Sequence, residues 1–254
     1  MIDLIDLCSL PIYFNDKDSK IVFGDNVLHD LDNTIYLTNL RPALLNKSLV
    51  YPVEVYEESQ NVRLSNHDGL IGDDLEYDLI LLPEGLLGIE YIKSHIFYSG
   101  ADTAGQISCL VEVLLGKLCI ILQKNGDFNN YTSELQVEQG LYVELEEGQK
   151  AVIQKGYYYT FINISSAPVI FARAYSQKGI ADYSTLRDKG MAYFCIRKNA
   201  RAEIVKNPKY RNVPEITRIS PMDTFEQYDS ICQHQPLYNQ IAASINMFLD
   251  LLLG

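Results

Sequence analysis

The sequence predicts an all-β fold, a barrel or sandwich of short strands. Between residues 77 and 198, apolar runs of strand length alternate with Gly, Pro, Asn and Ser at a spacing of about ten residues, which is the pattern of such folds. The expected strands, with turn residues such as Gly140 between them, are residues 77–83, 89–98, 108–115, 117–123, 134–139, 141–145, 150–154, 157–164, 168–176 and 191–198. The chain holds 18 Tyr and no Trp, and tyrosine favours strands over helices. A hydrophobic content of 47% is enough for a packed core.

The flanking segments have other patterns. Up to residue 60 there are possible short strands, with a helix expected around residues 41–47, and residues 59–74 are expected to form a polar loop. After Pro236, apolar residues at three- and four-residue intervals predict an amphipathic helix that covers the barrel or contacts a second subunit. These residues are Leu237, Ile241, Ile245, Phe248 and Leu252. We therefore divide the chain into an N-terminal extension (1–47), a barrel domain (48–211) and a C-terminal tail (212–254).

Composition argues against several classes of partner. The formal net charge is −12 and the pI is about 4.7, so the chain repels phosphate backbones and anionic lipid head groups. We expect neither a nucleic-acid nor a membrane partner. The five cysteines are scattered and form no Cys-x-x-Cys pair, which favours free thiols in a reducing compartment. The N-terminus (MIDLIDLCSLP) has no basic segment, so we expect no signal peptide and a cytoplasmic location.

One spaced pattern resembles a known motif. Gly148, Gln154, Gly156, Tyr159 and Asn163 have the spacing of the second cupin motif, G-x5-P-x-G-x2-H-x3-N, with Gln for Pro and Tyr for the metal-binding His. The glycines suit tight turns at strand ends. The resemblance implies a cupin double-stranded β-helix, which is a jelly-roll barrel, with the His position pointing inward.

The wider chain resembles the cupin-type (archaeal-type) glucose-6-phosphate isomerases. LLPEGLLGIEYIKSH is similar to the segment that enters the metal site of that family, and VIFARAYSQKGIADYSTLRDKG is similar to a later strand and turn. The matching residues are Pro83, Gly85, Gly88, Glu90, Lys93, Gly116, Lys117, Leu122, Gln123, Tyr175, Asp182, Tyr183, Thr185, Gly190, Asn207 and Pro208, with Ser94 in place of a threonine. The resemblance extends over residues 48–211 and implies isomerisation of glucose 6-phosphate and fructose 6-phosphate.

The residues that would hold the family's divalent metal are replaced. The family uses three His and one Glu, and these positions fall at Phe97, Ser99, Cys109 and Tyr159. Phe has no lone pair, and Ser and a neutral phenol are poor ligands. We therefore expect no metal and no other cofactor, and a degenerate site. Glu112 is the candidate catalytic base if the alignment shifts by three residues.

The resemblance also places substrate-binding residues. Ser94 and Tyr175 fall at positions that contact the substrate phosphate in the family, and Tyr183 lies in a matching segment. The hydroxyls of Ser94 and Tyr175 can donate to an anion, or the two residues can be ordinary polar residues of the barrel. Asp78 falls near a family threonine and would oppose a phosphate. Tyr157 and Tyr159 would fill the space of the metal site or stack on a sugar.

Three functions follow as hypotheses. The first is a glucose-6-phosphate isomerase, as the family resemblance implies. The second is a non-catalytic protein that binds a sugar phosphate or another small anion. The third is a structural or partner-binding cupin whose barrel is filled by aromatic side chains. By resemblance to the family, we also expect a homodimer.

Overall fold

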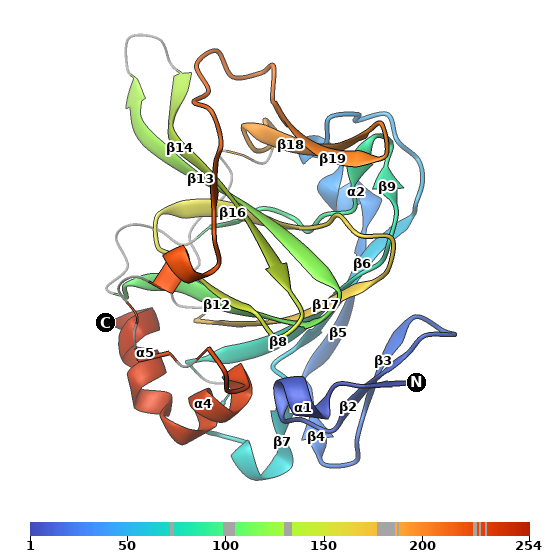
Figure 1. Cartoon of the computed structure of the whole chain (residues 1–254), viewed down its shortest axis with the longest axis vertical. Coiled ribbons are helices and arrows are strands. Elements are labelled where there is room, and N and C mark those ends of the chain that lie inside the picture. The colour runs from blue at the N-terminus through green and yellow to red at the C-terminus, as the bar shows by residue number, and fades with distance from the viewer. Residues whose placement is uncertain are drawn as a thin grey trace.

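The structure is a computed structural model that describes residues 1–71, 74–98, 105–129, 134–176, 186, 188–225, 228, 230–231 and 233–254. Two β-sheets form the body of the molecule (Figure 1). The six-stranded sheet has the order β15 (Lys150–Gln154), β12 (Ile107–Leu115), β17 (Val169–Tyr175), β8 (Glu76–Leu82), β6 (Glu54–Gln60) and β5 (Leu31–Tyr36). The five-stranded sheet has the order β11 (Phe97–Tyr98), β16 (Tyr157–Asn163), β13 (Lys117–Asn129), β14 (Glu134–Glu146) and β20 (Thr217–Ile219).

The chain passes repeatedly from one sheet to the other. β8, β12, β15 and β17 belong to the six-stranded sheet, whereas β11, β13, β14 and β16, which intervene in the sequence, belong to the five-stranded sheet. This alternation is the connectivity of a jelly-roll barrel. The predicted all-β barrel is therefore confirmed.

Apolar side chains from both sheets fill the space between them. Because successive residues of a strand point to opposite faces, Phe171 on β17 points into the barrel and Ala172 points out. Ile80 of β8 and Ile120 of β13 belong to the same interior cluster as Phe171.

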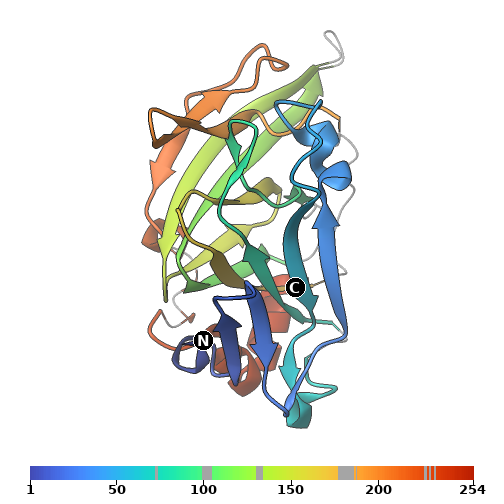
Figure 2. The same cartoon turned by 90° about the vertical axis from the view of Figure 1, so that its right-hand side faces the viewer.

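Both ends of the chain cover the outer face of the six-stranded sheet (Figures 1 and 2). The N-terminal segment forms β1 (Ile2–Asp3), α1 (Ile5–Cys8), β2 (Ile12–Asn15) and β3 (Lys20–Phe23). The C-terminal segment forms α4 (Leu237–Ala243) and α5 (Ile245–Leu253). The helical tail is confirmed, but it consists of two helices, because Ser244 has a non-helical backbone between them.

A smaller sheet covers part of the outer face of the five-stranded sheet. It has the order β19 (Arg201–Lys206), β18 (Tyr193–Lys198), β10 (Glu90–Tyr91) and β9 (Leu86–Leu87). Gly140, expected to separate two strands, lies inside the continuous strand β14. A Cβ atom at Gly140 would overlap the ring and hydroxyl of Tyr193, so the glycine serves close packing and not a turn.

Some local expectations were wrong. Residues 89–98, expected as one strand, form only β10 and β11, with a single bridge from Lys93 to Ile162 between them. The helix expected around residues 41–47 begins earlier, as α2 (Leu37–Leu40) and the 3-10 turn η1 (Arg41–Ala43). The remaining elements are β4 (Val27–Leu28), β7 (Arg63–Leu64), η2 (Ser65–His67) and η4 (Met222–Phe225). Within the described ranges, no helix has the length and apolar character to cross a bilayer.

Candidate functional site in the barrel interior

Three of the four positions to which the metal ligands map lie together inside the barrel. Phe97 on β11 is paired with Tyr159 on β16, and their ring centroids are 5.4 Å apart. Cys109 on β12 is fully buried, and its thiol interacts with Tyr159. The fourth position, Ser99, lies outside the described residues.

These side chains do not suit a divalent metal. Phe97 offers no donor atom. Burial raises the pKa of the Cys109 thiol to about 11, and burial also raises the pKa of the Tyr159 phenol well above its usual value, so both are neutral at physiological pH. In the part of the chain that the structure describes, no group of three His, Cys, Asp or Glu residues is placed to hold a metal. The donors therefore do not fit the ligand set of three His and one Glu.

An arginine lies where these side chains meet. Arg173 projects inward from β17 and is 4% exposed. Its guanidinium carbon lies 4.2 Å from the ring centroid of Phe97 and 3.9 Å from that of Tyr175. A guanidinium remains charged inside a protein, and aromatic faces on both sides stabilise that charge.

Carboxylates complete the arginine's surroundings. Arg173 Nη2 lies 2.9 Å from Asp78 and 3.2 Å from Glu58, and the Tyr175 hydroxyl donates to Glu76 at 2.6 Å. Burial raises the pKa of Glu58; Arg173 opposes this rise, and Asp78 and Glu76 add to it. One guanidinium is thus paired with two carboxylates, and a third, that of Glu76, is bonded to the Tyr175 hydroxyl.

His95 lies beside this group but is neutral. Its Nδ1 makes a short contact with the Tyr56 hydroxyl, and its ring lies 3.9 Å from that of Phe97 between centroids. Burial and the nearby charge of Arg173 lower the pKa of His95 to about 3. A neutral imidazole packed against Phe97 in this way completes an aromatic layer and carries no charge near pH 7.

The expected phosphate contacts already have protein partners. Ser94 Oγ donates to the His95 carbonyl at 2.8 Å and accepts from the Phe161 amide at 3.0 Å. Tyr175 donates to Glu76. Both residues are buried, and their hydroxyls are already bonded to other protein groups. The neighbouring carboxylates would also repel a phosphate. Tyr183 lies outside the described residues.

Glu112 does not reach the interior. Val111 and Val113 point into the barrel, so Glu112 faces outward between them. Its Oε1 lies 2.8 Å from Lys150 Nζ, and its Oε2 accepts from the Leu237 amide at 2.8 Å. The proposed shift of three residues is an odd number, which moves a side chain to the opposite face of a strand. The placement of Glu112 as an interior base is therefore corrected.

Sequence reasoning missed Arg173 and Glu58. The strand VIFARAY is apolar apart from Arg173, which alternates with Phe171 and Tyr175 on one face. A charged residue on an inward face requires a partner of opposite charge, and Asp78 was already noted on another predicted strand. A charged residue on the inward face of an apolar strand was therefore the signal from which a buried ion pair could have been predicted.

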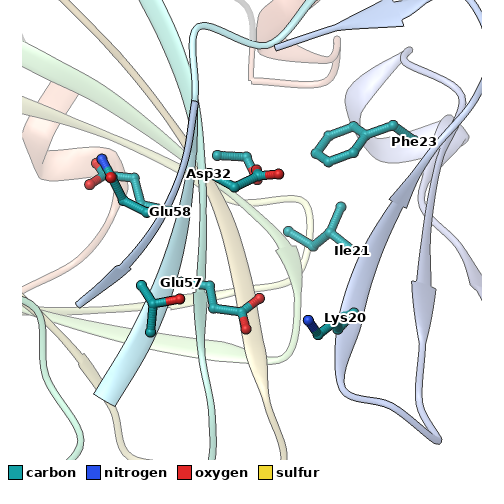
Figure 3. Close-up of a pocket in the computed structure, with 9 residues that line it drawn as sticks. Lys20, Ile21, Phe23, Asp32, Glu57 and Glu58 are labelled. Atoms are coloured by element: carbon teal, nitrogen blue, oxygen red, sulfur yellow. The ribbon is translucent and has the colours of Figure 1, made fainter. Parts of the chain in front are cut away.

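Glu58 also lines a small pocket outside the barrel wall. The pocket has a volume of about 150 Å³ and lies between β3 and the strands β5 and β6 (Figure 3). Ile21 and Phe23 extend from β3 toward Asp32 and Glu57 on the other side. The side chain of Glu57 faces this pocket, whereas that of Glu58 lies on the opposite face of β6, where it pairs with Arg173.

The jelly-roll connectivity and the motif positions inside it define a cupin-type barrel. The chain belongs to the glucose-6-phosphate isomerase (GPI) family, whose model matches residues 39–214. The glucose-6-phosphate isomerase of Pyrococcus horikoshii is 24% identical over 141 residues, 55% of this chain and 66% of that protein. The enzyme of Pyrococcus furiosus is 26% identical over 141 residues, 54% of this chain and 66% of that protein. The matches thus span just under two thirds of these relatives.

Solved structures show weaker likeness. The cupin domain of Drosophila melanogaster CENP-C is 13% identical, with 46% of this chain and 67% of that chain covered and a TM-score of 0.29. An oxalate decarboxylase of Bacillus subtilis is 10% identical, with 50% of this chain and 27% of that chain covered and a TM-score of 0.31. Neither likeness is strong enough to carry an argument about function.

Proposed function

We propose that this chain is a non-isomerising member of the GPI family, a cupin that keeps the barrel as a scaffold and acts by binding. The observation that carries this proposal is the position of Arg173. Its guanidinium lies between Phe97 and Tyr175 and is paired with Asp78 and Glu58.

Electrostatics supports the proposal. Phe97 and the neutral Cys109 and Tyr159 offer a divalent metal ion no anionic ligand, and Asp78 and Glu58 are already paired with Arg173. A metal ion stabilises transition-state charge by several kcal/mol, so its loss lowers the rate by roughly a thousand-fold or more. The carboxylates around Arg173 also disfavour a phosphorylated substrate.

A coupled assay of isomerisation between glucose 6-phosphate and fructose 6-phosphate tests the proposal. We expect no turnover above background with or without added Fe²⁺, Mn²⁺ or Zn²⁺, and no bound metal after dialysis. A metal-dependent isomerase activity that co-purifies with the folded chain would overturn the proposal.

A thermal-shift measurement with the same sugar phosphates distinguishes the sugar-phosphate-binding hypothesis. We expect no stabilisation, because Ser94 and Tyr175 are bonded to protein groups. A stabilisation that disappears in Tyr175→Phe would favour a sugar-phosphate binding protein instead.

A further inference from the structure

A pocket on the outer surface has a buried charged pair at its base. It has a volume of about 390 Å³ and lies between helix α1, the turn at residues 147–150 and the segment at residues 233–236. Glu112 and Lys150 line it and are each only 1–2% exposed. This volume lies in the range of small-molecule sites.

Two hydrogen-bond donors at the base have unused capacity. Lys150 Nζ is within hydrogen-bond distance of two acceptors among the described residues, Glu112 Oε1 at 2.8 Å and the Gln233 carbonyl at 2.9 Å. An ammonium group has three donors, so one is left over. Gln233 Nε2 is buried, and within the described part of the chain it has no hydrogen-bond partner. A buried donor without an acceptor costs free energy unless a water or a ligand supplies one.

Acceptors and apolar groups line the rest of the pocket. Asp6 and Glu147 are exposed carboxylates among its lining residues, and Leu7, Met222 and Pro236 add apolar surface. Glu112 already balances the charge of Lys150. The pocket therefore offers donors at its base and carries net negative charge overall, which disfavours phosphate and carboxylate ligands.

We propose that this pocket binds a small uncharged molecule with several hydroxyl groups, such as a monosaccharide or another polyol. A hydroxyl group is both a donor and an acceptor. One hydroxyl can accept from Lys150 and Gln233, while others donate to Asp6 and Glu147. The C–H surface of a polyol fits against Leu7, Met222 and Pro236. This site is on the opposite face of β12 from Cys109, so it is independent of what happens in the barrel interior.

Isothermal titration of the full chain with glucose, mannose, myo-inositol and mannitol tests the proposal. We expect at least one of them to bind, and glucose 6-phosphate to bind at least about ten-fold more weakly than glucose because of the added charge. Gln233→Glu replaces the unsatisfied donor by an acceptor of the same shape and should weaken polyol binding at least about ten-fold. Gln154→Glu is the matched control, because it makes the same change at an exposed position outside the pocket and should leave binding unchanged.

Backbone-amide NMR shifts on titration keep the test decisive if Gln233→Glu fails to fold. In the parent chain, glucose or mannitol should shift residues 6–7, 147–150 and 233–237 and leave β8 and β17 unchanged. No binding by any of the four polyols, equal binding of glucose 6-phosphate, or shifts confined to the barrel interior would each overturn the proposal. The first result would mean that water alone satisfies Lys150 and Gln233. None of these outcomes depends on the isomerase assay.

Discussion

At the scale of single residues, Arg173 carries a full positive charge in a part of the barrel otherwise lined by rings and carboxyl groups. The family holds a metal cation with imidazole and carboxylate ligands, and this chain holds a guanidinium with Phe97, Tyr175 and two acidic residues. A covalently attached cation cannot exchange ligands with a substrate. The arginine therefore supplies no open coordination position.

Removing the arginine should be costly. Arg173→Met keeps an apolar stem between the two rings but leaves Asp78 and Glu58 buried without their cation. We expect a loss of about 3–5 kcal/mol in the free energy of unfolding. Arg173→Met with Asp78→Asn should recover at least about 1 kcal/mol, because the double variant removes one of the two unpaired carboxylates. Urea unfolding measures the free energy of unfolding of both variants. A value for Arg173→Met within about 1 kcal/mol of the parent would contradict the ion-pair argument.

The raised pKa of Glu58 predicts a pH dependence of stability. Because the folded state holds this proton more tightly than the unfolded state, Glu58 contributes stability below its unfolded pKa and loses it as pH rises through the folded pKa. Glu58→Gln cannot ionise, so its melting temperature should rise relative to the parent as the pH increases above the usual pKa of glutamate. Glu57→Gln, on the other face of β6, is the control and should show no such trend. Parallel curves for Glu58→Gln and the parent would exclude the effect.

At the scale of elements, alternation and turn residues were enough to predict most barrel strands. β8, β12, β15, β16 and β17 lie within a residue or two of the runs chosen from the sequence. The pattern failed at residues 89–98, where Glu90 accepts from the Leu45 amide at 2.6 Å and the Ser94 hydroxyl accepts from the Phe161 amide at 3.0 Å. Such long-range bonds leave no periodic signal in a sequence.

Gly140 tests the packing of the outer sheet on β14. Gly140→Ala should displace the Tyr193 ring and loosen the β18–β19 hairpin, at a cost of about 1–3 kcal/mol. Gly126→Ala is the matched control in β13, because its Cβ would meet only the flexible side chain of Glu138. Chemical denaturation compares the two variants. Equal stabilities would show that the hairpin adjusts at no cost.

At the scale of the whole molecule, the sequence predicted the barrel but not what fills the interior. Phe97, Cys109 and Tyr159 could be aligned because motif spacing is local. The charge pair of Arg173 with Glu58 joins residues 115 positions apart, and the face on which Glu112 lies is set by its place on β12 between Val111 and Val113. Contacts of this kind are set by the folded barrel.

The homodimer expected from the family resemblance is still a prediction. Val50, Tyr51 and Val53 are 55–74% exposed and precede β6, close to the outer strand β5 of the six-stranded sheet. Apolar side chains grouped beside a sheet edge favour association with a second copy. We expect sedimentation velocity to show a dimer that Tyr51→Glu dissociates; the control Met222→Glu should not. A monomer at all concentrations would contradict the prediction.

The C-terminal helices share a hydrophobic core with the barrel sheet and the N-terminal segment. Phe248 of α5 is fully buried in one cluster with Leu10 from the N-terminal segment and Leu79 and Leu110 from the barrel sheet. Phe248→Ala should therefore lower the free energy of unfolding by about 3–5 kcal/mol, whereas Met222→Ala, 61% exposed, should change it by less than about 0.5 kcal/mol. If the tail shares this core, fluorescence and circular dichroism will report the same single unfolding transition in the parent and in the variant. A separate early transition in Phe248→Ala, with the barrel unaffected, would instead mean that the helices dock on a barrel that folds without them.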